Sequence, residues 1–344
     1  MQRNRTSIIY AVMIFLMLFT ACSSPYSEPS KKFELTDEEH LWLEKFFRYF
    51  MLHETAIYTL AGSKPLTEMI LCYQDIPEEQ LREEKREDYL YFLLNRSNEK
   101  DVKFYKKLSP LEKEEKALLI NDKDFIYNIE ELWEKWEKIQ HRFSIKKRFL
   151  LLKQERPRED WKEIFPNYTA IYDILFVDVL KTALVIQENY ELFRKAVGYD
   201  FDPFEVVFEL ENKHSNFWGK LEGKEGWRYA TLWGLLYGFG KENAFSYTWK
   251  GRSTKEPHRT EKEKLWAANL QSQSSCKNRP SGSEEGAFTI SNFTTPIFKS
   301  FIENDPVVAK YEAERESIRQ LYKGKDFVSC TLELLTELPG MEKE

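Results

Sequence analysis

Cysteine and histidine are scarce in this sequence, and their scarcity limits the chemistry that it can carry. The chain of 344 residues contains four cysteines and five histidines. Cys72, Cys276 and Cys330 have no CxxC spacing, which argues against a disulfide scaffold but leaves one bridge among them open. His53 begins the only His-Glu pair, and the second histidine that a zinc-binding helix needs one turn later is missing. We therefore expect neither a metal nor another cofactor.

Signatures of nucleophilic catalysis are missing as well. The sequence contains no GxSxG nucleophile elbow and no SxxK motif with its companion residues. Paired carboxylates cannot be singled out among 57 acidic residues, because any spacing then arises by chance. His53 and Glu54 could pair in a cleft, although the commoner role of such a histidine is a hydrogen bond at the edge of the core. We assign no catalytic residue from the sequence.

A hydrophobic run long enough to cross a membrane is also absent. The apolar residues 8–19 form a run of twelve, whereas a membrane-spanning helix needs about 20 residues. Arg3 and Arg5 precede the run, and the small residues Thr20 and Ala21 follow it. A basic start, a short apolar run and small residues at its end are typical of an export signal. We predict a signal peptide at residues 1–21.

Cys22 directly follows these small residues, and the stretch resembles the lipobox of bacterial lipoproteins. In that motif the cysteine is diacylated and becomes the mature N-terminus, so the resemblance implies that Cys22 carries the lipid anchor. Two or more acyl chains give stable membrane attachment. An ordinary cleaved signal or an uncleaved anchor are the alternatives. Residues 22–35 are rich in Ser, Pro and charge and predict a flexible tether.

Positive charge is in the minority. The chain has 51 Lys and Arg against 57 Asp and Glu and a net charge of −6. Loss of residues 1–21 would bring the charge to about −8, because it removes Arg3 and Arg5 and no acid. Such a chain binds phosphate backbones poorly, so nucleic acid is excluded as the main partner.

Aromatic residues, by contrast, are abundant at 15% of the chain. In such numbers they usually build a bulky core, and a sugar-stacking groove is the functional alternative. The tryptophans to inspect for such a groove are Trp133, Trp136, Trp218, Trp227 and Trp233.

Periodicity predicts an α+β fold that is predominantly α-helical, with a small sheet of short strands. A helix is expected at 36–62, opened by a capping box of Thr36 and Glu39, and another at 122–143 with an amphipathic stripe. Further helices are expected at 179–198, from Asp202 as N-cap with Pro203 after it, and at 304–324 with Pro306 at its start. Charged helical segments are expected at 77–99 and 109–117, and strands at 67–74, 148–154 and 172–178. We expect a main, mostly helical domain at 36–250, a polar and partly disordered insertion at 251–286, and a C-terminal strand and helices at 287–338 that pack on the main domain.

The glycine-rich stretch at 226–247 is the most conspicuous candidate site. Its Gly-Lys pair lacks the spacing and the following Ser or Thr of a phosphate loop. Gly234 and Gly238 are four residues apart, so on one helix they would allow another backbone to approach closely, with Gly240 as the C-cap. The helix therefore either packs tightly or presents Trp233, Gly234, Gly238 and Gly240 to a ligand. A membrane-inserting hairpin is the third alternative.

Three stretches, at 56–69, 233–245 and 311–327, resemble segments of uncharacterised lipoproteins from chlamydia-related intracellular bacteria. The resemblance implies an envelope lipoprotein in a host-associated bacterium and carries over no catalytic residue. Ser23, after the anchor, favours the outer membrane over the inner one by analogy with enteric lipoproteins.

We expect a membrane-anchored envelope lipoprotein with a non-enzymatic structural or interaction role, exposed to the periplasm or the cell surface. Its partners would be the membrane, through the lipid, and an envelope protein or the cell wall. The alternatives are an exported hydrolase acting on glycans or peptides, and a small-ligand or carbohydrate-binding protein with an aromatic cleft.

Overall fold

The computed structural model describes residues 33–74, 129–158, 162–163, 168–212, 214–222, 228–252, 260–276 and 289–337. By its contacts the chain divides into residues 1–35 and a body of residues 36–344. The predicted signal peptide and Cys22 lie outside the described residues, as do the charged helices expected between 77 and 117. No helix within the described ranges has both the length and the apolar character of a membrane span.

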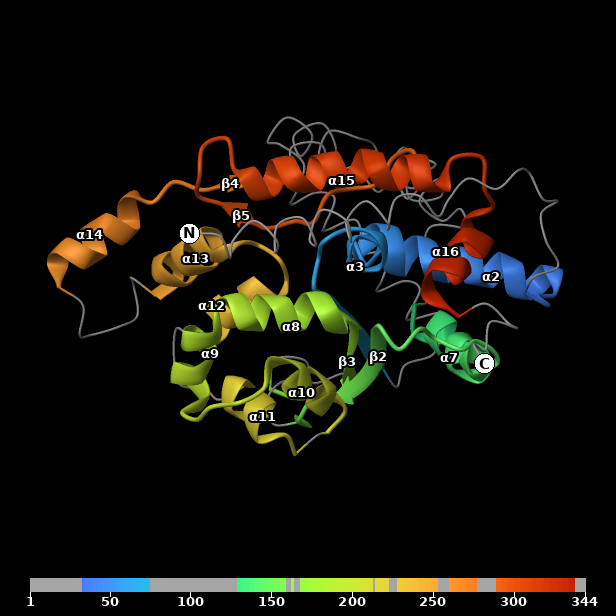
Figure 1. Ribbon diagram of the computed structural model, residues 1–344, viewed down its shortest axis with the longest axis horizontal. Coiled ribbons are helices and arrows are strands. Elements are labelled where there is room, and N and C mark those ends of the chain that lie inside the picture. The colour runs from blue at the N-terminus through green and yellow to red at the C-terminus, as the bar shows by residue number, and fades with distance from the viewer. Residues whose placement is uncertain are drawn as a thin grey trace, which may run out of the picture. The chain divides into compact units, whose positions relative to one another are not determined.

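The helix expected at 36–62 forms in three pieces (Figure 1). They are α2 (Asp37–Phe47), the π-helical turn η1 (Arg48–His53) and α3 (Ile57–Ala61). The predicted capping box is confirmed: the backbone N–H of Glu39 donates to Thr36 Oγ1 at 3.1 Å, and the Thr36 N–H donates to Glu39 Oε2 at 2.8 Å. The interruption follows η1, where Thr55 adopts a left-handed backbone with φ of 62°. Helical periodicity alone did not indicate this break.

Three antiparallel strands form the main sheet, in the order β1-β3-β2. They are β1 (Leu66–Gln74), β2 (Phe149–Glu155) and β3 (Tyr168–Asp178), close to the three predicted strands. Glu68 lies opposite Leu175, and Ile70 lies opposite Asp173. Residues two apart on a strand share a face, so Glu68 and Asp173 lie on the same face of the sheet.

An aromatic core covers one face of the sheet. It includes α2, η1 and α7 (Ile129–Ile139), which ends in the short η2 (Gln140–Arg142). The Phe46 and Trp136 rings stack with centroids 5.8 Å apart, and Phe50 meets Phe176 of β3 edge to face at 5.9 Å. The buried residues of α7 are Ile129, Leu132, Trp133 and Trp136, which confirms the predicted amphipathic stripe over the described part of this helix.

A second core forms around the other face, where Leu66, Leu175 and Val177 are buried. The helices that build it are α8 (Val179–Glu188), α9 (Tyr190–Val197), α10 (Pro203–Phe208), α11 (Asn216–Glu222) and α12 (Arg228–Leu236), with η4 (Glu209–Glu211) after α10. The predicted start at Asp202 is confirmed, since its side chain accepts from the N–H groups of Phe204 and Glu205. Gly198 ends α9 in a left-handed conformation, as expected.

The remaining elements lie in the C-terminal part of the described chain. They are α13 (Lys241–Arg252), α14 (Glu261–Asn269), β4 (Gln273–Ser274), β5 (Lys299–Ser300), α15 (Pro306–Tyr322) and α16 (Phe327–Leu335). Within the predicted insertion, the described residues include α14 and β4, which pairs with β5. Cys72, Cys276 and Cys330 form no disulfide with one another. The architecture is α+β and predominantly helical with a small sheet, as predicted.

Candidate functional site

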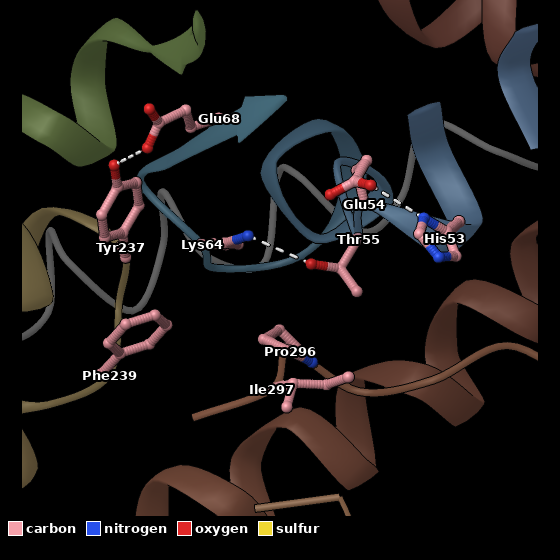
Figure 2. A pocket seen from close by; sticks show the side chains of 9 residues that line it. All are labelled: His53, Glu54, Thr55, Lys64, Glu68, Tyr237, Phe239, Pro296 and Ile297. Carbon is pink, nitrogen blue, oxygen red and sulfur yellow. Dashed lines mark hydrogen bonds and ion pairs between the residues drawn. The ribbon is translucent and has the colours of Figure 1, made fainter. Parts of the chain in front are cut away.

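A pocket of about 270 Å³ lies where four separate segments of the body meet. Its lining comes from the end of η1 and the loop before α3, from the α3–β1 loop and β1, from the turn between α12 and α13, and from the segment before β5. Figure 2 shows the lining side chains, which are His53, Glu54, Thr55, Lys64, Glu68, Tyr237, Phe239, Pro296 and Ile297. We call this cavity the Lys64 pocket.

Lys64 is the most unusual residue of the pocket, because it is a lysine that is only 6% exposed. The ammonium Nζ donates to Thr55 Oγ1 at 3.1 Å, and no other described residue accepts a hydrogen bond from it. Burial lowers the pKa of Lys64 to about 8, while the carboxylates of Glu54 and Glu68 act in the opposite direction. The side chain therefore loses its proton far more readily than a lysine in water.

The loops around Lys64 hold it in place. Its backbone N–H donates to the carbonyl oxygen of Tyr58 at 3.1 Å, just after Gly62 ends α3. Its partner Thr55 is 5% exposed and occupies the left-handed region, which is rare for a β-branched residue. Such strain costs on the order of 1–3 kcal/mol and concentrates at functional sites. Here it aims the Thr55 hydroxyl at the ammonium.

His53 and Glu54 are partly buried and line the pocket next to Thr55. His53 Nδ1 lies 2.8 Å from Glu54 Oε1, and the two side chains are 25% and 26% exposed. The Tyr49 ring stacks on the imidazole with centroids 4.7 Å apart. Burial, followed by the charge of Glu54, raises the pKa of Tyr49 above its usual value. The pairing that the sequence left as an alternative is thus present, and it opens onto a cavity.

Glu68 enters the pocket from β1, as part of a group of four polar side chains. The Tyr237 hydroxyl donates to Glu68 Oε2, and the Arg156 guanidinium donates to Glu68 Oε1 at 3.0 Å. Arg156 also holds Asp173, with Nε 2.7 Å from Oδ2. Burial raises the pKa of the Glu68 carboxyl, and the neighbouring Asp173 adds to the rise, against the opposing effects of Tyr237 and Arg156. The Arg156 guanidinium thus binds the carboxylates of both Glu68 and Asp173. Because its pKa is raised, Glu68 keeps its proton to a higher pH than an ordinary glutamate.

Apolar side chains complete the pocket. In Figure 2, Phe239, Pro296 and Ile297 lie opposite the polar groups of the η1–β1 region. Phe239 and Tyr237 are close neighbours, with ring centroids 5.6 Å apart, and Ile297 is 41% exposed at the rim. The pocket therefore offers polar groups of both signs on one side and an apolar surface on the other.

Only part of the predicted glycine-rich site lies near this pocket. Trp233 and Gly234 belong to α12, where Trp233 is 8% exposed in the second core and outside the pocket lining. A Cβ at Gly234 would lie 2.9 Å from Ala244 Cβ of α13, so two helices approach closely there. Four of the five tryptophans considered for a sugar-binding face are buried, and Trp227 lies outside the described residues.

Gly238 does not continue the helix, although the sequence had suggested that it would, and Gly240 is not its C-cap but directly precedes α13. The helix ends at Leu236, and both glycines have left-handed backbones in the turn to α13, with φ of 76° and 80°. A left-handed residue cannot extend a right-handed helix, which is why Gly238 does not share a helix face with Gly234. Gly238 sits between the pocket residues Tyr237 and Phe239, and its carbonyl accepts a hydrogen bond from the Tyr311 hydroxyl at 2.9 Å.

No protein-family model, curated protein or solved structure matches this chain. The resemblance to lipoproteins of chlamydia-related bacteria therefore stays a prediction. Sequence reasoning missed Lys64, Glu68 and Tyr237, and no local signal distinguishes them. Lys64 occurs in a turn with Ser63 and Pro65, where a lysine is ordinarily exposed.

Proposed function

We propose that this chain is an envelope lipoprotein, anchored through acylated Cys22, and that its body binds a small ligand in the Lys64 pocket without turning it over into a released product. The basic start, the short apolar run and the small residues before Cys22 support the anchor. The negative net charge and the polar composition of residues 22–35 suit a body held in water beside a bilayer. The outer membrane, exposed to the periplasm or cell surface, is the proposed location.

The observation that carries the binding proposal is the buried ammonium of Lys64. A lysine removed from water without a carboxylate partner costs stability, and an apolar residue of similar shape would fill its place at lower cost. Perturbed titratable groups in a cavity are markers of functional sites. The only described acceptor for Lys64 is a hydroxyl on a strained residue, so two of its three N–H groups are available to a ligand.

The pocket walls define the chemistry of that ligand. Glu54 and Glu68 balance the charge of Lys64, so a strongly anionic ligand would be disfavoured. A hydrogen-bond acceptor would face Lys64 and donor groups would face the carboxylates, while an apolar face would lie on Phe239. The volume of about 270 Å³ suits a small molecule of low net charge.

Thermal unfolding of the full chain in detergent tests this proposal. The ligand panel consists of monosaccharides, amino acids and small aldehydes and ketones. A ligand present at about 100 times its dissociation constant should stabilise the chain by about 2.7 kcal/mol. This gain should persist in the control Lys195→Met, which changes an exposed residue of α9, and disappear in Lys64→Met. Stabilisation of the same size in Lys64→Met would place the ligand elsewhere and refute the proposal.

A second candidate function is hydrolysis of glycans or peptides. It is favoured by one observation, namely that the Lys64 pocket brings together two carboxylates, Glu54 and Glu68, with the raised pKa of Glu68 suiting a general acid. Turnover of esters, peptides or glycans by the purified chain, lost in Glu68→Gln, would establish this function and overturn the non-enzymatic one. We expect no turnover.

A further inference from the structure

Lys64 is buried, whereas Lys181 and Lys146, whose pKa values desolvation also lowers, are only partly buried and have stronger partners. Lys181 forms an ion pair with Asp178 at 2.8 Å and donates to the Thr59 carbonyl at 2.7 Å. Lys146 donates to two backbone carbonyls, those of Glu333 and Leu334. Lys64 has only the Thr55 hydroxyl among the described residues, and it alone of the three lines the cavity. Lys64 Nζ is therefore shielded from bulk water and held by one hydrogen bond, and a ligand in the cavity can reach it.

Such an amine has the properties of a nucleophile. A lysine becomes reactive when desolvation favours its neutral form, because the free electron pair on nitrogen is then available. With a pKa of about 8, roughly a tenth of the Lys64 amine is neutral at pH 7. An exposed lysine, with a pKa of about 10.4, has less than about a thousandth in that form.

We propose that Lys64 Nζ forms a covalent imine with a small uncharged aldehyde or ketone bound in the Lys64 pocket. This inference rests on the proposed function, because it uses the same ligand pocket. An uncharged carbonyl compound fits because Glu54 and Glu68 disfavour an anion, and because Phe239, Pro296 and Ile297 accommodate its carbon chain.

The reaction needs nothing beyond the two partners and a transferable proton. The Nζ electron pair attacks the carbonyl carbon, and the carbonyl oxygen takes up a proton to give a carbinolamine. The carbinolamine hydroxyl is then protonated and leaves as water, while a C=N bond forms. The two amine hydrogens end in that water, and nothing is oxidised or reduced. The titratable side chains that line the pocket beside Lys64 are those of His53, Glu54, Glu68 and Tyr237. We assign the delivery and recovery of the proton to Glu68, whose pKa is raised.

Borohydride trapping tests the imine directly. The full chain in detergent is incubated at pH 7 with propanal or acetone, reduced, digested, and analysed by mass spectrometry for alkylation of each lysine. We expect Lys64 to be alkylated at least tenfold more than the partly buried Lys181 or the exposed Lys195. Its alkylation should rise with pH, reach half its maximum near pH 8 and level off above about pH 9, whereas that of Lys195 should continue to rise. Alkylation of Lys64 no greater than that of Lys181 would overturn the proposal.

Two variants separate this proposal from simple binding. Glu68→Gln should slow trapping at Lys64 at least tenfold, while Tyr237→Phe, which keeps the ring and removes the hydroxyl, should slow it less. Unchanged trapping in Glu68→Gln would contradict the proton-transfer role.

A ligand that stabilises wild type but not Lys64→Met, without leaving any trapped adduct, would overturn the imine and leave the binding proposal in place. Adducts at Lys64 without any thermal stabilisation would support the imine alone.

Discussion

At the scale of single residues, the buried ammonium of Lys64 lowers the stability of the folded chain. Its pKa is about 8 in the folded chain, against about 10.4 for an unperturbed lysine. At a pH between these two pKa values, Lys64 is mostly protonated in the unfolded chain and mostly neutral in the folded chain. The free energy of unfolding therefore rises with pH in this window, and the full penalty, about 3 kcal/mol, applies below pH 8.

Replacement of this lysine should accordingly stabilise the protein in a pH-dependent way. Lys64→Met removes the buried charge and should raise the free energy of unfolding at pH 7. Its advantage over wild type should shrink by about 2 kcal/mol between pH 7 and pH 10. Urea denaturation at both pH values measures the difference. The matched control is Lys181→Met, which breaks an ion pair with the buried Asp178 and should destabilise. A constant advantage of Lys64→Met would contradict the lowered pKa.

Thr55 provides a second test at this scale, through its left-handed backbone. Thr55→Gly and Thr55→Ala both remove the hydroxyl that accepts from Lys64, so their difference isolates backbone strain. Glycine adopts this conformation freely, whereas alanine does not. The glycine variant should be more stable than the alanine variant by about 1 kcal/mol in chemical denaturation. Equal stabilities would show that Thr55 is not strained.

At the scale of elements, helix starts depend on local chemistry and helix contacts on small residues. Asp202 and Asp305 each cap a helix with proline at its first turn. The sequence indicated the Asp202 cap and the two prolines. Gly234 allows α12 to approach α13 at Ala244, whereas Gly219 in α11 has nothing within 4 Å of its ideal Cβ position. The two helical glycines thus differ only in their tertiary surroundings.

The same substitution should therefore have opposite effects at these positions. Gly219→Ala should raise the free energy of unfolding by about 0.5–1 kcal/mol, because alanine favours the helix. Gly234→Ala should lower it by about 1–3 kcal/mol, because a methyl group would collide with the Cβ of Ala244. Thermal and urea denaturation of both variants provide the measurement. Stabilisation by Gly234→Ala would show that α12 and α13 can separate without cost.

At the scale of the whole molecule, the sheet separates two cores, and four segments of the body line the Lys64 pocket. Residues 53 and 297 both line it, although 244 positions separate them in the chain. The proposed anchor, by contrast, depends on a few consecutive residues that precede the body.

The anchor can be tested independently of the pocket. Wild-type chain expressed in a bacterial host should incorporate radiolabelled palmitate, and Cys22→Ala should not, because the acyl chains are attached through that cysteine. Cys72→Ala serves as the control and should keep the label, since Cys72 belongs to β1 of the body. Equal labelling of wild type and Cys22→Ala, or intact mass showing residues 1–21 still attached, would contradict the lipoprotein proposal.

The sequence by itself determined the features that depend on neighbouring residues. Capping at Thr36 and Asp202 and the strand at Leu66–Gln74 were predictable because their causes lie within a few positions. The break at Thr55 and the left-handed turn at Gly238 were not, because a helical pattern continues through both. Only the tertiary structure decided that Lys64, Glu68 and Tyr237 share a cavity. Their chemistry arises from burial and from charges brought together across the chain, and neither is a property of local sequence.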